Sequence, residues 1–61
     1  MTERWLVKAP FFQGQIIVTD EVIQKRFTCD AFKKFHGKPI EVAEDYAAKN
    51  GWELENTGEY D

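Results

Sequence analysis

Ten residues at positions 9–18, APFFQGQIIV, constrain the fold more than any other feature, because bulky apolar side chains flank a Gln-Gly pair. Residues 4–12 and 15–19 are rich in side chains that favour strands. Between them lie Gln13 and Gly14, and glycine readily takes the positive φ that a two-residue hairpin turn needs. The sequence therefore predicts an antiparallel hairpin that turns at Gln13 and Gly14.

The predicted turn also decides which side chains share a face of the hairpin. A two-residue loop at this position pairs Phe11 with Ile16. Alternation then makes one face wholly apolar, and we expect it to form the core: Trp5, Val7, Ala9, Phe11, Ile16 and Val18. The opposite face is mixed and holds Leu6, Lys8, Pro10, Phe12 and Ile17. Because Pro10 has no N–H to donate, we expect the first strand at a sheet edge.

The segment after the hairpin is ambiguous. Residues 20–27 fit either a helix or, after a turn at residues 19–21, a third strand. The strand is favoured because Thr28 is a good N-cap for a new helix over residues 29–36, with Phe27 and Phe32 at the positions of a hydrophobic staple. Gly37 suits the end of that helix.

A second helix follows almost at once. Pro39 suits its first turn, Lys49 its last turn, and the pair Asn50-Gly51 its end. Its buried stripe is expected at Ile40, Ala43, Tyr46 and Ala47. Trp52 and Leu54 then point inward from a closing strand. The sequence thus predicts one small α+β domain, an antiparallel sheet with two short helices packed on one face, and a polar tail at residues 56–61 that frays.

Composition indicates whether this chain folds and in which cellular compartment we expect it. The chain has 61 residues, 43% of them hydrophobic and 15% aromatic, which is too apolar for a disordered segment but leaves little core. Its single cysteine, Cys29, forms no internal disulfide, so a reducing cytoplasm is the expected location. The charges at Glu3, Arg4 and Lys8 argue against a signal peptide or a membrane span at the N-terminus.

Catalytic and metal-binding chemistry find little support. Cys29 and His36 are two helical turns apart and could pair as a thiol and a base. Nothing in the sequence marks a group that would orient the base or a glycine-rich loop that would hold an oxyanion. One cysteine and one histidine also fall short of a zinc site. We therefore expect no enzyme, no metal and no cofactor.

Two surfaces are candidate interaction sites for another protein. Leu6, Phe12 and Ile17 on the mixed hairpin face would form an apolar patch, unless the chain's own tail, with Tyr60, covers it. Glu41, Glu44 and Asp45 on the second helix would steer and orient a partner. The leading hypothesis is a noncatalytic protein-binding module, an inhibitor or adaptor. In size and composition it resembles small acidic α+β phage and prophage products that bind host proteins. A homodimer through paired strand edges is compatible with it.

The alternative hypothesis is nucleic-acid binding by a basic middle segment with interleaved aromatic residues. Its cationic side chains are Lys25, Arg26, Lys33, Lys34 and Lys38. Phe27, Phe32 and Phe35 lie among them, a mixture typical of proteins that bind single strands. The net charge of −3, from eleven acidic and eight basic side chains, opposes nonspecific attraction to phosphates.

Overall fold

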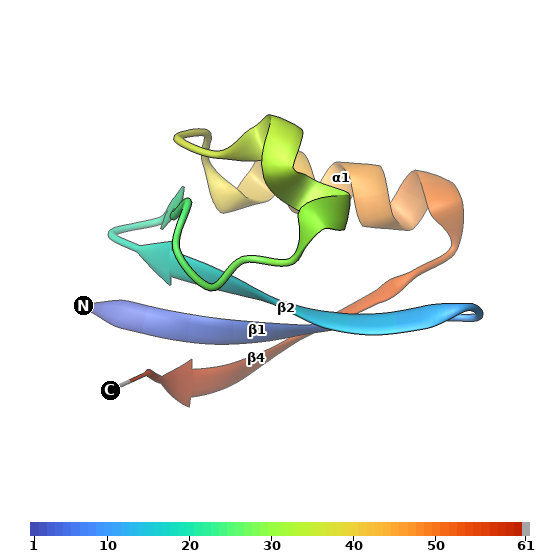
Figure 1. The fold of residues 1–61 in the computed structure, drawn as a ribbon, viewed down its shortest axis with the longest axis horizontal. Coiled ribbons are helices and arrows are strands. Elements are labelled where there is room, and N and C mark those ends of the chain that lie inside the picture. Colours follow the sequence, from blue (N-terminus) through green and yellow to red (C-terminus); the bar gives the residue numbers. More distant parts are fainter. Residues whose placement is uncertain (61) are drawn as a thin grey trace.

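The protein has two layers, a four-stranded antiparallel sheet and a layer of helices on one face of it, as a computed structural model that describes residues 1–60 shows (Figure 1). In chain order the elements are β1 (Thr2–Ala9), β2 (Phe12–Thr19), β3 (Val22–Ile23), the 3₁₀ helix η1 (Asp30–Phe35), α1 (Ile40–Asn50) and β4 (Glu53–Glu59). The strands stand in the order β3-β2-β1-β4. The predicted α+β fold is confirmed.

The β1–β2 turn lies at Pro10 and Phe11, so the predicted turn at Gln13 and Gly14 is wrong. Ala9 pairs with Phe12 across the turn. Proline is favoured at the second position of a type I turn, in which both central residues have negative φ, and neither Pro10 nor Phe11 has a positive φ. The hairpin therefore turns where proline presets the backbone, and not where glycine offers freedom.

This turn shifts the pairing without exchanging the faces of β2. Ile16 pairs with Trp5 where Phe11 was expected, a difference of six residues. An even shift keeps Ile16 on the core face. Phe12, however, now begins β2 on the core face, and Phe11 leaves the strands and is 76% exposed. The two phenylalanines thus exchange the roles predicted for them.

Strand β1 is central and not an edge strand. It pairs with β2 on one side and with β4 on the other. Pro10 lies beyond the last residue of β1, so its missing N–H costs the sheet no hydrogen bond. The expectation of an edge strand is wrong because it rested on placing Pro10 within the strand.

A second tight turn leads from β2 into β3. Asp20 and Glu21 both have positive φ, as a type I′ hairpin turn requires. The favoured strand forms, although β3 contains two residues only. The chain then follows the outer edge of β2, where the Gln24 N–H donates to the Ile17 carbonyl (2.7 Å) and the Cys29 N–H to the Gln15 carbonyl (2.8 Å). This edge of the sheet is therefore closed.

The covering segment explains why residue 14 is a glycine. A Cβ atom at Gly14 would lie 2.8 Å from both Cβ and Sγ of Cys29, closer than real Cβ atoms approach. The glycine is thus needed for close approach of the chain and not for a turn.

The first helix is shorter than expected and of a different kind. It is a 3₁₀ helix that begins at Asp30, with Cys29 at the N-cap position and no side-chain cap. The Thr28 hydroxyl instead accepts a hydrogen bond from the Ile17 N–H (3.1 Å). Phe27 pairs with Tyr60 and not with Phe32, so the predicted cap and staple are wrong. The Thr28 hydroxyl thus bonds to the backbone of β2 and does not cap a helix.

Helix α1 and strand β4 follow the sequence closely. Gly51 ends α1 in the left-handed conformation, with φ 73°. Ile40, Ala43 and Ala47 are buried on the sheet side. Strand β4 continues to Glu59, and the Tyr60 N–H donates to the Thr2 carbonyl (2.8 Å), so residues 56–60 pair with β1 where a frayed tail was expected. Asp61 lies outside the described residues.

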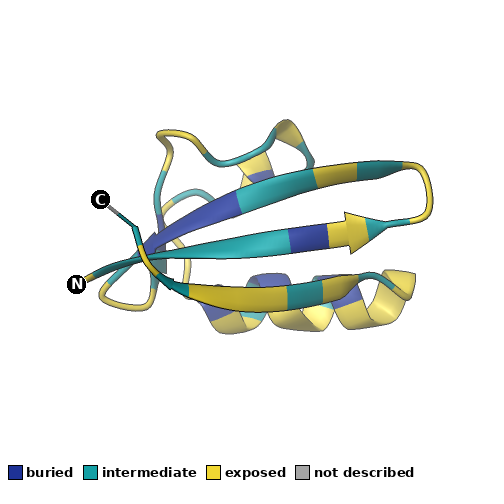
Figure 2. Ribbon diagram, turned by 90° about the horizontal axis from the view of Figure 1, so that it is seen from below, coloured by how far each residue is buried: buried dark blue, intermediate teal, exposed yellow. Residues whose placement is uncertain are grey.

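The core lies between the inner face of the sheet and the two helices. Its buried members are Val7, Ile16, Val18, Ile23, Phe32, Phe35, Ile40 and Ala43. Figure 2 looks onto the opposite, outer face and shows α1 running beside β4. Within residues 1–60, no helix has the length and apolar character needed to cross a membrane.

Candidate interaction surfaces

The predicted apolar patch of Leu6, Phe12 and Ile17 is not assembled. Leu6 lies on the outer face, paired with Gln15 and Glu55, and is half-buried. Phe12 is on the opposite face and packs against the core. Ile17 shares the outer face with Leu6 but is only 4% exposed. These three side chains therefore offer a partner no common surface.

Ile17 is covered by the chain itself and not left open to a partner. Phe27 and Tyr60 meet on the outer face with ring centroids 6.4 Å apart. Together with Ile17 they line an open cavity of about 300 Å³. Phe27 holds this position with a φ of 62°, a backbone conformation unusual for a bulky residue.

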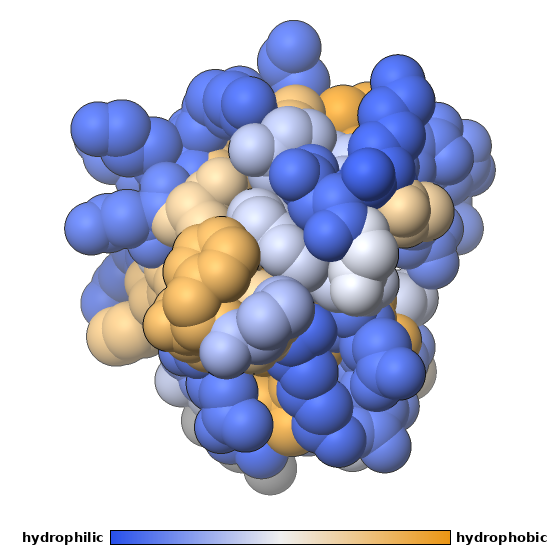
Figure 3. Space-filling model, turned by 90° about the vertical axis from the view of Figure 1, so that its right-hand side faces the viewer, coloured by the Kyte–Doolittle hydropathy of each residue, from blue (hydrophilic) through white to orange (hydrophobic). Residues whose placement is uncertain are grey.

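The most exposed aromatic ring stands at the tip of the β1–β2 hairpin. Phe11 is 76% exposed. Its ring centroid lies 5.2 Å from that of Phe12 and 6.0 Å from that of Trp52, the latter nearly edge-on at 77°. Phe12 and Trp52 in turn meet at 5.1 Å and 90°. Figure 3 shows this end of the molecule, where an apolar area is surrounded by hydrophilic side chains.

The tip is held to the core by a series of aromatic contacts. Trp52 lies 6.0 Å from Phe32 and 5.5 Å from Tyr46. Phe32 is completely buried. Phe11 is therefore braced by rings that are themselves part of the core, although its own ring is open to solvent. Pro10 is the sequence signal that could have revealed this residue, because proline in the second position of a turn leaves the next side chain at the tip.

The three acidic residues predicted on α1 are all exposed and occupy adjoining positions on its surface. Asp45 lines a groove toward η1 together with Lys49. Glu41 and Glu44 are three residues apart, and this spacing places them on one side of the helix. Glu41 and Asp45 are four residues apart, so the same rule places these two on one side as well. Val42 and Tyr46 mark the side of α1 that faces η1. The period of 3.6 residues places Glu44 on the other side, and α1 runs beside β4 (Figure 2).

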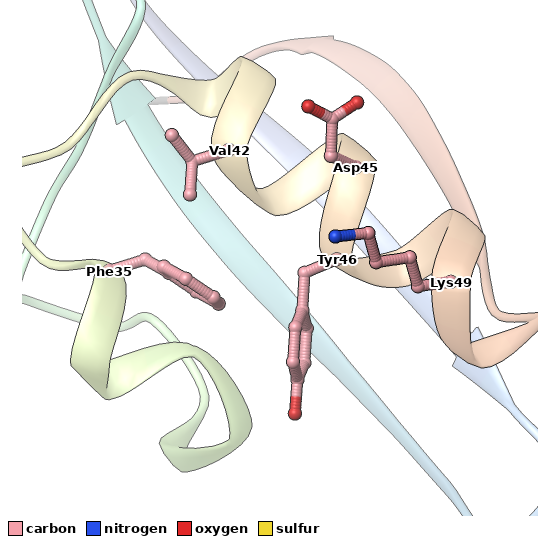
Figure 4. A pocket seen from close by; sticks show the side chains of 5 residues that line it. All are labelled: Phe35, Val42, Asp45, Tyr46 and Lys49. Atoms are coloured by element: carbon pink, nitrogen blue, oxygen red, sulfur yellow. The ribbon is translucent and has the colours of Figure 1, made fainter.

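The groove between η1 and α1 is open and has mixed character (Figure 4). Its volume is about 280 Å³, and Phe35, Val42 and Tyr46 form its apolar part. Opposite charges, from Asp45 and Lys49, stand at its rim. The groove thus combines three apolar side chains with one charge of each sign.

The five basic residues of the nucleic-acid hypothesis fall into separate groups. Lys33 and Lys34 belong to η1, and Lys34 Nζ lies 4.3 Å from the ring centroid of Tyr46. Lys25 and Arg26 lie on the segment beside β2, with the Arg26 guanidinium 5.3 Å from the ring centroid of Phe27. Lys38 is in the loop before α1, where its carbonyl accepts from the Ile23 N–H.

Only one of the three interleaved phenylalanines is available for stacking. Phe27 is 59% exposed, whereas Phe32 and Phe35 are buried in the core. The basic middle segment therefore offers one cationic and aromatic pair, Arg26 and Phe27, and no continuous stacking surface.

Cys29 and His36 do not form a catalytic pair in the described structure. No hydrogen bond joins them within residues 1–60, and burial raises the pKa of the Cys29 thiol. A raised pKa keeps the thiol protonated at neutral pH, the opposite of what a nucleophilic cysteine needs. Among the same residues, no group of three or more His, Cys, Asp or Glu side chains could hold a metal ion.

Comparisons with protein-family models, with curated proteins and with solved structures find no match to this chain.

Proposed function

We propose that this protein is a noncatalytic protein-binding module, an inhibitor or adaptor of the kind phages and prophages encode, that docks through its hairpin tip. The observation that carries this proposal is Phe11, a bulky apolar ring 76% exposed on a two-residue turn. A chain with so little core material gains nothing in its own fold from leaving such a ring in water. Binding of a partner to the hairpin tip would remove this ring from water.

The brace around Phe11 suits it to be an anchor for a partner. Full burial of a phenylalanine side chain contributes about 1.5–3 kcal/mol. The contacts of Phe11 with Phe12 and Trp52 restrict its ring before binding, so less side-chain entropy is lost in a complex. Interface hot spots are typically a few aromatic residues surrounded by weaker contacts. Glu41 and Glu44 would steer a partner of opposite charge.

The setting proposed for this module is the cytoplasm. Its lone Cys29 is half-buried and stays reduced there, and the fold uses no disulfide staple.

The test starts from affinity capture with the wild-type chain and identification of the retained protein by mass spectrometry. With that protein purified, we expect Phe11→Ser to weaken binding at least about tenfold, equivalent to 1.4 kcal/mol. Phe11→Tyr keeps the ring and serves as the matched control, with binding near that of wild type. Circular dichroism should show the same fold and melting temperature in all three proteins. Equal affinity of wild type and Phe11→Ser would overturn the proposal.

Nucleic-acid binding remains a second candidate because of one observation. Arg26 lies over the exposed ring of Phe27, which combines a positive charge with a stacking surface. This candidate requires that a labelled single-stranded oligonucleotide bind at about 50 mM salt, more weakly as salt rises. It also requires that Arg26→Gln reduce the binding. An absence of binding at that salt concentration would remove it.

A further inference from the structure

One edge of the sheet has no partner. Strand β4 pairs with β1 on one side, and it is the last strand in the order β3-β2-β1-β4. Among residues 1–60 no backbone hydrogen bond joins the outer side of β4 to another element. Five of its seven residues are exposed: Glu53, Glu55, Asn56, Thr57 and Glu59. Its outer N–H and C=O groups are therefore available to an added strand over residues 53–56. Beyond Asn56 a β-bulge shifts the register, and the Gly58 N–H donates to Asn56 Oδ1 (2.8 Å).

The side chains of β4 decide which strand could be added. Three of the seven are glutamates, at positions 53, 55 and 59. In antiparallel pairing of two copies centred on Glu55, that residue would face its own copy, and pairing centred on Asn56 would set Glu53 against Glu59. Like charges directly opposite each other destabilise a strand pair. A homodimer through this edge is thus disfavoured.

Helix α1 adds to the negative charge along this edge. Val42 and Tyr46 face η1, and the period of 3.6 residues places Glu44 on the other side of α1. Helix α1 runs beside β4 (Figure 2). Within residues 1–60, the cation paired with this group is Lys8, whose Nζ lies 3.6 Å from Glu55 Oε2 in an exposed ion pair. Such exposed pairs contribute little, so the edge keeps a net negative charge.

The open edge begins directly beside the hairpin tip. Glu53, the first residue of β4, follows Trp52, whose ring contacts Phe11. A segment lying along β4 would thus reach the aromatic side chains of the tip at one end. The backbone edge, the charge and the apolar anchor form one continuous surface.

We infer that the partner of this module contributes an extended, basic segment that pairs with β4 as a fifth strand. Its main chain bonds to the open edge, and its lysine or arginine side chains meet the glutamates of β4 and α1. This inference rests on the proposed function, because it states which chemistry the partner presents next to Phe11.

The experiment titrates the isotope-labelled full chain with three synthetic peptides and follows its backbone amides by NMR. The first peptide, KTKVKTK, is basic and able to form a strand. The second, KPKVKPK, has the same charge but proline at two positions, which removes donors and hinders pairing. The third, ETEVETE, is acidic. We expect saturable shifts confined to β4 and the facing side of α1 with the first peptide, and binding at least about fivefold weaker with the other two.

Matched protein variants separate the edge from general electrostatic attraction. Glu53→Gln/Glu55→Gln should weaken KTKVKTK binding at least about threefold, because it removes two charges beside the added strand. Glu21→Gln/Asp30→Asn removes two exposed charges away from β4 and should leave binding near wild type. Equal binding of the two basic peptides, equal effects of the two double variants, or no binding at about 1 mM peptide would each overturn the inference.

The captured partner distinguishes failure of this inference from failure of the proposed function. If Phe11→Ser abolishes binding of the purified partner while Glu53→Gln/Glu55→Gln leaves it unchanged, the edge inference is wrong and the protein-binding function stands. Loss of binding in both variants supports the inference. If neither variant affects binding, the edge inference and docking through the hairpin tip are both wrong.

Discussion

The two edges of the sheet differ in how they are finished. At the β2 edge, two-residue β3 and the segment after it take up the backbone groups from Gln15 to Thr19, through Gln24, Thr28 and Cys29. At the β4 edge no described element takes up the outer groups, and glutamates stand along it. One edge is protected by being covered, and the other by charge.

The two edges also differ in how many residues their protection requires. Covering β2 requires irregular backbone, including the left-handed Phe27, and the 3₁₀ helix that anchors it through Phe32. A charged edge requires no additional residues and stays open to a partner of opposite charge. The β4 edge is therefore the one that we propose for recognition of a partner.

The largest expected effect comes from removing the anchor of the closed edge. Phe32 is completely buried between η1, α1 and the sheet, and its ring meets Phe35, Tyr46 and Trp52. Phe32→Ala should lower the free energy of unfolding by about 3–5 kcal/mol, since it leaves a large cavity. Urea denaturation measures this loss. Hydrogen exchange should show Ile17 and Cys29 amides losing protection before those of β1, and a loss below about 1 kcal/mol would contradict this view of the core.

A smaller effect is expected where the covering segment touches β2. Gly14→Ala places a Cβ atom 2.8 Å from two atoms of Cys29 and should cost about 1–3 kcal/mol by forcing the segment away. Cys29→Gly removes both contacted atoms. The double variant should therefore be more stable than the sum of the two single losses implies, as denaturation of all four proteins would show. Strict additivity would mean that the close approach imposes no constraint.

The smallest effect on stability is expected at the open edge. Glu53→Thr/Glu55→Thr should change the free energy of unfolding by less than about 0.5 kcal/mol, because both side chains are exposed and the Lys8 pair is weak. Removing the charges should instead let two copies pair through β4. Light scattering should find the wild type monomeric and the variant increasingly dimeric with concentration. A wild type that is already dimeric would contradict charge protection of this edge.

Much of the second half of the chain was predictable from sequence. The limits of α1, its buried face and its glycine end follow from local signals, and Trp52 and Leu54 point toward the core as expected. These features depend on contacts between residues close in sequence, for which periodicity and capping are good guides. Three predictions in this half are wrong. The first helix is a shorter 3₁₀ helix, and Tyr46 is only half-buried. The tail pairs with β1, which is a contact across the whole chain.

The first half was less predictable because two local signals compete there. Gln13-Gly14 and Pro10-Phe11 are both possible turns, and only one can close the hairpin. The turn at Pro10 and Phe11 is the one that forms, so Phe11 is exposed and Phe12 lies on the core face. Ile17 lies on the outer face with either turn and is nevertheless buried. Thr28 and Phe27 were similarly assigned to a helix start. In the structure the Thr28 hydroxyl accepts a hydrogen bond from the Ile17 N–H of β2, and Phe27 lines a cavity with Ile17. A turn and a strand separate both residues from β2 in the sequence.

The sequence by itself determined the α+β class, the presence of the hairpin, helix α1, the closing strand and the core positions of Ile16 and Val18. Those follow from alternation, helical spacing and capping, which act over a few residues. Only the tertiary structure decided the turn, the exposure of Phe11, the covering of Ile17 and which sheet edge stays open. The physical reason is that these features depend on contacts between residues distant in sequence, which no local pattern records. Cys29 approaches Gly14 closely, and Phe27 meets Tyr60 beside Ile17.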